Sequence, residues 1–358
     1  MIGEASLLEL VFNLFFFLLL VFFSYKNTKS NSVVNNWLVF IGIVTFCVYA
    51  YWGRDFFRYE DIFNTYKISH ELGHVEDAYD TIYNLSPNYS VFRLLLWGGA
   101  FTVLLVAFHR IKLKTNVFLF LFVAFYLLRF SYARVSLGVA IMFLGYSFFV
   151  NPLKRNTLLS YIIGIAILAF SVGFHKSMAL AIFPIPFAFI KWNKKTMLIA
   201  LLIAFPLLSA FVSTSLVDFI LKRNLIVDES TLAGFNSYLE GSGKESGWGI
   251  IIADILQLLP FYLTIIHCFV NYDKLGISVD RKAGLAVGLL FTTVIVATAF
   301  VFRQQLIFRR VIYMTYPALI ATVSCIFEKE SYSRWVRRII SIALIYQFYE
   351  LAYAIYCL

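Results

Sequence analysis

Long runs of apolar residues, separated by short polar segments, cover almost the whole chain. A helix needs roughly 20 apolar residues to cross the hydrocarbon core of a bilayer, and these runs are close to that length. They lie near residues 5–23, 37–52, 91–108, 116–130, 133–150, 157–173, 177–190, 196–221, 248–270, 283–302, 307–326 and 339–356. The pattern predicts an all-α polytopic integral membrane protein with about twelve transmembrane helices, forming a single domain over residues 1–358.

Composition supports this prediction and excludes a soluble globular class. Of the 358 residues, 61% are hydrophobic, 19% are aromatic and only 14% are charged.

The first run has no basic residues before Leu7 and no small-residue cleavage site after it. It is therefore interpreted as a transmembrane helix and not as a signal peptide.

The lysines and arginines of the short connections predict the orientation. Cytoplasmic loops of membrane proteins are enriched in these residues. Alternate connections carry Lys26 and Lys29, Arg110 to Lys114, Lys154 and Arg155, Lys191 to Lys195, Lys274 to Lys282, and Arg334 to Arg338. These connections are expected inside, which places both termini outside. The net charge of +10 then reflects topology, and no nucleic-acid partner is expected.

Two long connections, about 53–90 and 222–247, carry most of the acidic residues and are expected to be extracytoplasmic. The first mixes aromatic and charged residues, which predicts short amphipathic helices at the membrane interface. The second ends in a Gly- and Ser-rich stretch over 241–247, a composition suited to a flexible gate.

Arginines lie within or beside apolar runs at several outward ends, where positive charge is normally avoided. An arginine near hydrocarbon costs at least ~2.5–3.5 kcal/mol on insertion scales, so each needs a partner or an anionic ligand. The alternative for Arg129 and Arg134 is a guanidinium that extends to the headgroups. The set comprises Arg54, Arg58, Arg129, Arg134, Arg303, Arg309 and Arg310, with His175 and Lys176 at a similar depth.

Helical spacing orients part of this set. Arg134, Gly138, Ile141 and Gly145 share one face, and small residues favour close packing, so this face is expected to point inward. Adjacent residues cannot share a face, so Arg309 and Arg310 are not both expected to point into one site.

Four further side chains have both a chemical and a structural interpretation. A neutral His175 could accept a proton from a sugar hydroxyl, and a cationic one could bind phosphate, but a histidine at a helix end is often only a cap. Asp55 could orient Arg54 or act as a base, and the alternative is a solvated carboxylate. Asp254 and Glu350, deep in apolar runs, are functional candidates, and pairing with an arginine is the simplest explanation for them. The dispersed cysteines indicate neither a disulfide framework nor a metal site.

Four short motifs occur in order along the chain. They are Arg54-Asp55-Phe56-Phe57-Arg58-Tyr59 followed by Phe63, Arg134-Val135-Ser136-Leu137-Gly138, Gly173-Phe174-His175-Lys176-Ser177-Met178, and Phe308-Arg309-Arg310-Val311-Ile312-Tyr313. Together these motifs resemble the EpsG family, which is similar in role to Wzy-type O-antigen and capsule polymerases. The chain differs from that family at Val135 and Gly138, where the family tends to have Gln and Ala, and near Pro87-Asn88-Tyr89, where the family commonly has an acidic residue.

The resemblance implies a GT-C-like glycosyltransferase of the bacterial cytoplasmic (inner) membrane, with its active face extracytoplasmic. Such an enzyme polymerises undecaprenyl-pyrophosphate-linked oligosaccharide repeats into the O-antigen of lipopolysaccharide, capsule or exopolysaccharide. Donor and acceptor are both lipid-linked, no cofactor or metal is needed, and a flippase and a chain-length regulator are expected partners.

The resemblance and the charge pattern together assign roles to the candidate residues. The expected catalytic residues are His175, Arg134, Arg309 and Asp55. The expected pyrophosphate- and sugar-binding residues are Arg54, Arg58, Arg129, Arg303, Arg310, Lys176 and Tyr59.

Two other function classes fit parts of the pattern. A flippase or exporter of the lipid-linked saccharide would use the arginines as a translocation cleft, although carriers place their binding groups near the midplane. A membrane acyltransferase that modifies surface polysaccharide would use His175 as its base, and would leave the outward arginines unexplained.

Overall fold

The structure is a computed structural model, and all regular structure in its described residues is helical. The described residues are 7–30, 32–50, 54–69, 78–132, 135–154, 156–175, 178–179, 185, 192–198, 248–277, 282–290, 305–330 and 333–356.

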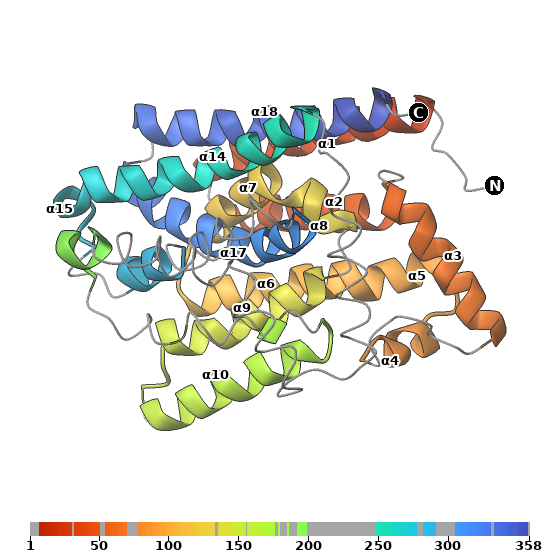
Figure 1. Ribbon diagram of the computed structural model, residues 1–358, viewed down its shortest axis with the longest axis horizontal. Coiled ribbons are helices and arrows are strands. Elements are labelled where there is room, and N and C mark those ends of the chain that lie inside the picture. Colours follow the sequence, from red (N-terminus) through yellow and green to blue (C-terminus); the bar gives the residue numbers. More distant parts are fainter. Residues whose placement is uncertain are drawn as a thin grey trace.

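Most of the helices lie roughly side by side, and α3 and α4 lie at one end of them (Figure 1). The N-terminal part contains α1 (Leu7–Ser30), α2 (Val33–Tyr49), α3 (Arg54–Ser69), α4 (Ala78–Leu85), α5 (Tyr89–Arg93), the π-helix η1 (Leu94–Gly98), α6 (Gly99–Arg110), α7 (Thr115–Phe125), α8 (Leu127–Tyr132), α9 (Ser136–Val150) and α10 (Thr157–Val172). The C-terminal part contains α14 (Trp248–Val270), α15 (Tyr272–Leu275), α17 (Gln305–Glu330) and α18 (Arg334–Tyr356).

Most apolar runs correspond to helices. The helix α14 has the predicted bounds, and α10 ends one residue before the predicted end. Several helices extend past their apolar runs at the polar end: α1 continues to Ser30, and α18 begins at Arg334 instead of near 339. An apolar run marks only the part of a helix that is suited to the hydrocarbon core. The helical backbone hydrogen bonds continue into the polar residues beyond that part. The predicted spans 177–190 and 196–221 lie mostly outside the described residues, as does 283–302 beyond residue 290.

The exterior of the bundle is apolar, as a membrane protein requires. Phe12, Trp37, Leu158 and Ile162 are all more than half exposed, although the opposite faces of their helices are packed. Among the described residues, two helical stretches, Val11–Ser30 and Tyr89–Arg110, are long and apolar enough to cross a bilayer unaided, and several shorter apolar helices accompany them.

Aromatic rings fill the interior between α6, α7 and α9. The Phe108 ring stacks on Phe118 at 4.2 Å and on Phe143 at 5.0 Å, and Phe101 lies 4.6 Å from Phe122, all measured between ring centroids. These side chains are almost completely buried. Offset and tilted ring pairs add to the stabilisation from burial, and they fix the three helices relative to one another.

The helices α9 and α10 pack closely through glycines. A Cβ atom on Gly145 would lie 2.9 Å from the Leu168 Cγ and 3.0 Å from the Gly164 carbonyl oxygen. A Cβ atom on Gly138 would lie 3.2 Å from the Met178 side chain. The small-residue face of α9 therefore packs inward, as its spacing predicts.

Gly145→Ala is expected to destabilise the protein by about 1–3 kcal/mol, because the new methyl group meets backbone that cannot move aside cheaply. Gly99→Ala is the matched control, since a Cβ atom there has nothing within 4 Å. Thermal unfolding in detergent should show a lower midpoint for Gly145→Ala only. Equal midpoints for the two variants would contradict the close α9–α10 contact.

The connections that carry lysines meet at one end of the bundle, here called the lysine end. The Lys282 Nζ donates to the Lys112 carbonyl oxygen at 2.8 Å, and Lys194 pairs with Asp273 at 2.9 Å. In Figure 1 this is the end where α15 lies. The structure thus gathers connections that the positive charge pattern assigns to one side of the membrane.

Candidate functional site

The opposite end of the bundle contains the candidate residues and is here called the arginine end. It is formed where α2, α8, α10 and α18 finish and where α3, α5, α9 and α17 begin. Three buried basic side chains from this end are described: Arg93, Arg129 and His175. Their contacts show how the end is built.

Arg129 lies at the centre of a buried polar cluster with Tyr313, Tyr346 and Glu350, here called the Arg129 cluster. Its guanidinium forms an ion pair with Glu350 and a hydrogen bond to the Tyr346 hydroxyl, and it donates to the Tyr313 hydroxyl at 3.4 Å. The Tyr346 hydroxyl in turn donates to the Glu350 carboxylate at 2.6 Å. The cluster ties α8 to α17 and α18, and Glu350 has the arginine partner that its position in an apolar run predicts.

A second layer of polar contacts lies beside this cluster. The Tyr126 hydroxyl donates to the Tyr313 carbonyl oxygen at 3.3 Å, and the Tyr126 ring stacks on Tyr316 at 4.7 Å. The Gln347 amide donates to the Phe125 carbonyl oxygen at 2.7 Å. The two tyrosine contacts hold α17, and the Gln347 contact holds α18, against the α7–α8 junction. The backbone of Arg309 and Arg310 lies on α17 one turn before Tyr313.

Arg93 is only 1% exposed and was missed by the sequence analysis. Its Nε and Nη2 donate to the Cys47 carbonyl oxygen at 3.0 and 2.5 Å, and Nη2 also reaches the Ser131 carbonyl oxygen at 3.4 Å. The guanidinium lies 4.8 Å from the Trp97 ring centroid. Arg93 therefore caps the end of α2 and connects it to α8. The sequence did contain a signal for Arg93: an arginine inside the apolar run 91–108 has the same cost of membrane insertion as the other arginines.

The turn that carries His175 packs against the start of α9. The helix α10 ends at Val172, and the Met178 amide then donates to the His175 carbonyl oxygen at 2.8 Å. Gly138, in the first turn of α9, contacts Phe174 and Met178 on either side of the histidine. His175 is 8% exposed, and its segment thus lies next to the helix that follows Arg134 in the chain.

The outer helices α3 and α4 are fixed to this end by aromatic contacts. The Phe63 ring lies 5.5 Å from Phe92, and Tyr59 lies 6.4 Å from Trp97. The Tyr79 ring of α4 meets Phe174 edge-on at 5.8 Å, beside the histidine turn. The predicted short helices of the first outer connection are therefore present and packed on the bundle.

A polar contact also joins α3 to α4. The Tyr66 hydroxyl hydrogen-bonds the Asp80 carboxylate and lies 2.9 Å from the Asn84 amide oxygen. The hydrogen bond to Asp80 raises the pKa of Tyr66 above its usual value, so the phenol remains a donor. This contact fixes the helix whose first two turns carry Arg54, Asp55 and Arg58.

The structure brings part of the predicted site to one end. Side chains are described for Arg129, His175 and Tyr59, and helical backbone for Arg54, Asp55, Arg58, Arg309 and Arg310. Arg134, Lys176 and Arg303 lie outside the described residues. Within the described part of the chain, no group of three or more His, Cys, Asp or Glu is arranged to hold a metal ion.

Comparison with known proteins gives one match, to a family. No curated protein and no solved structure matches the chain. The sequence model of the EpsG family matches residues 37–357, which is nearly the whole chain and includes every helix of the arginine end. The protein therefore belongs to the EpsG family, whose members are polysaccharide polymerases of the Wzy type.

Proposed function

We propose that this protein polymerises undecaprenyl-pyrophosphate-linked oligosaccharide repeats at the outer leaflet of the bacterial cytoplasmic membrane. One lipid-linked chain is the donor, and the non-reducing sugar of a second lipid-linked repeat is the acceptor. The product is an O-antigen, capsule or exopolysaccharide chain. Family membership supports the glycosyltransferase class, and the chemistry of the arginine end supports this substrate.

The observation that carries the proposal is the burial of arginine at the arginine end. Arg93 and Arg129 are buried there and the backbone of Arg309 and Arg310 lies at the same end, whereas Arg334, Arg337 and Arg338 at the lysine end are exposed. A guanidinium holds two phosphate oxygens with its planar fork, and an ammonium cannot. An end built from arginine in an apolar bundle is suited to a membrane-anchored pyrophosphate.

In the proposed reaction, an acceptor hydroxyl attacks the anomeric carbon of the donor sugar. The bond from that carbon to the pyrophosphate oxygen breaks, and undecaprenyl pyrophosphate leaves with the electron pair. Arg134 and Arg309, with Arg303, stabilise the negative charge that grows on the leaving group. His175 or Asp55 accepts the hydroxyl proton.

Arg129 has a different part in this proposal. Its charge is already balanced by Glu350, and its Nη1 and Nη2 atoms donate to tyrosine hydroxyls. We assign it to positioning α8 and α17, so that the basic residues at the start of α9 and α17 face one substrate. Tyr59, Arg54, Arg58 and Lys176 are proposed to contact the sugar and phosphate groups nearer the membrane surface.

Reconstitution tests the function directly. Purified protein in liposomes with a synthetic lipid-linked repeat should produce a ladder of polymers on a gel. The ladder should persist in EDTA, because fixed guanidinium groups supply the positive charge that a divalent ion would otherwise provide. Loss of the ladder in EDTA and its return with added magnesium would contradict the proposed charge stabilisation.

A deletion strain separates the polymerase from the flippase. Loss of a polymerase leaves single-repeat material on the cell surface, whereas loss of a flippase leaves repeats inside the cell. We expect single repeats outside. Internal accumulation would overturn the proposal in favour of translocation.

A further inference from the structure

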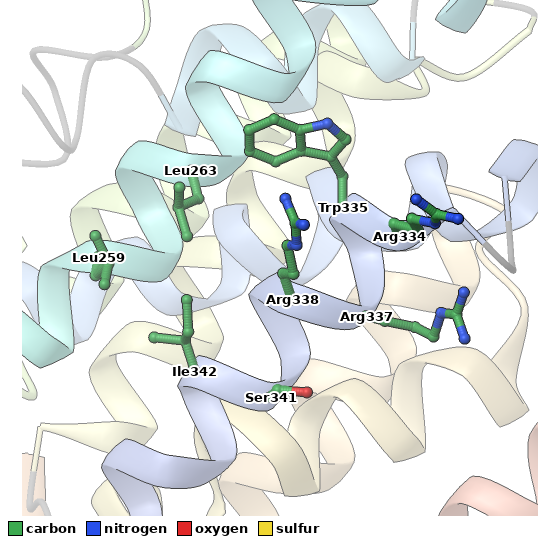
Figure 2. A pocket seen from close by; sticks show the side chains of 8 residues that line it. All are labelled: Leu259, Leu263, Arg334, Trp335, Arg337, Arg338, Ser341 and Ile342. Atoms are coloured by element: carbon green, nitrogen blue, oxygen red, sulfur yellow. The ribbon is translucent and has the colours of Figure 1, made fainter.

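A groove lies between α14 and α18 at the lysine end, far from the candidate site. Its volume is about 640 Å³. In Figure 1 the two helices run together along one edge of the bundle. The groove is lined by Leu259 and Leu263 of α14 and by Arg334, Trp335, Arg337, Arg338, Ser341 and Ile342 of α18 (Figure 2).

The basic part of the groove has an unusual electrostatic arrangement. Arg334, Arg337 and Arg338 are exposed and occupy the first turns of α18, where the helix dipole is already positive and where no acidic residue is present. Among the described residues, no carboxylate pairs with any of the three guanidinium groups. Three guanidinium groups repel one another and the helix end, and a bound anion would relieve both effects.

The apolar part of the groove continues into the hydrocarbon-facing surface. Leu259, Leu263 and Ile342 are half-buried along its floor. Ile345, one turn beyond Ile342 on the side away from the arginines, is 57% exposed. A ligand in the groove would therefore meet positive charge at one end and a continuous apolar surface at the other.

The side chains show where each part of a ligand would lie. In Figure 2, Arg338 lies between the two helices below the indole of Trp335, whereas Arg334 and Arg337 extend from α18 away from α14. The Arg338 guanidinium is 5.9 Å from the Trp335 ring centroid. Arg338 is thus held inside the groove, with the other two arginines at its rim.

We infer that this groove binds an anionic glycerophospholipid of the leaflet at the lysine end. The lipid phosphate lies between Arg338 and the rim arginines, Ser341 donates to it, and one acyl chain follows Leu259, Leu263 and Ile342. Charge complementarity selects an anionic headgroup, and the open apolar floor selects a lipid over a soluble phosphate. The inference is independent of the polymerase proposal.

Native mass spectrometry of the full-length protein in detergent tests the inference. Dioleoyl phosphatidylglycerol should bind at least about tenfold more tightly than dioleoyl phosphatidylcholine. Arg337→Ala/Arg338→Ala should weaken phosphatidylglycerol binding about 30-fold, or ~2 kcal/mol at about 1.4 kcal/mol per factor of ten. Glycerol phosphate, which has the headgroup without chains, should not displace the lipid at equal concentration.

Matched variants keep the test decisive. Lys26→Ala/Lys29→Ala removes equal charge at the same end outside the groove and should leave binding unchanged. Leu263→Trp fills the floor without changing charge and should weaken binding, whereas Leu158→Trp on the exposed face of α10 should not. Arg337→Lys/Arg338→Lys keeps the charge and should bind phosphatidylglycerol better than the alanine double variant does. It replaces the alanine double variant in the test if that protein folds poorly. Equal binding of both lipids, or no effect of the alanine pair and Leu263→Trp, would overturn the inference.

Discussion

Glu350→Ala should destabilise the protein by about 3–5 kcal/mol, because it leaves the Arg129 guanidinium charged and buried without its counter-ion. Tyr346 would lose its acceptor in the same change. The end of α18 is then expected to separate from α8 and α17. Thermal unfolding in detergent, together with protease cleavage near the C-terminal end of α18, would measure the loss.

The double variant Arg129→Met/Glu350→Met distinguishes lost packing from an uncompensated charge. Replacing both members of a buried pair with apolar residues is often neutral, so this variant should recover most of the lost stability. An unfolding midpoint for Glu350→Ala equal to that of the wild type would show that the ion pair does not hold the three helices together.

Arg134→Ala and Arg309→Ala should each lower polymerisation by about 10²–10³-fold, equivalent to ~2–4 kcal/mol of transition-state stabilisation. Arg134→Lys should fail nearly as badly, because an ammonium cannot form the two-pronged contact with pyrophosphate. The measurement is the initial rate of ladder formation with a lipid-linked repeat.

Lys29→Ala is the charge-matched control, since it removes a cation from the opposite end of the bundle and should leave the rate unchanged. Normal unfolding midpoints for the arginine variants would exclude misfolding as the cause. Wild-type rates in Arg134→Ala would remove this residue from the proposed pyrophosphate site.

The apolar pattern predicts the described helices well, and for a physical reason. Each span must satisfy its own backbone hydrogen bonds in hydrocarbon, so a run of apolar residues has little choice but to be helical. The bounds of α14 match the prediction, and Pro260 does not interrupt it, since the helix continues through Val270. Ends such as that of α1 at Ser30 were predicted less well, because polar residues beyond the hydrocarbon also favour helix.

The types of residue that form the candidate site were predicted better than the contacts between them. The free-energy cost of a charge inside the membrane indicates that Glu350 needs an arginine partner. Helical spacing cannot identify that partner, because Arg129 lies on another helix more than two hundred residues earlier in the chain. Arg93 was missed because no other arginine lies near it in the sequence. Its partners are backbone carbonyls, which leave no trace in the sequence.

The π-helix η1 has a consequence for how the third apolar run tolerates change in length. Its wider turn contains one residue more than an α-helical turn, and each residue rotates a helix by about 100°. Removing a single residue between Leu94 and Gly98 would restore regular coiling and leave the faces of α6 nearly unchanged, because the wider turn already absorbs the extra residue. The same deletion within α6 would instead turn Phe101 and Phe108 relative to each other and away from α7.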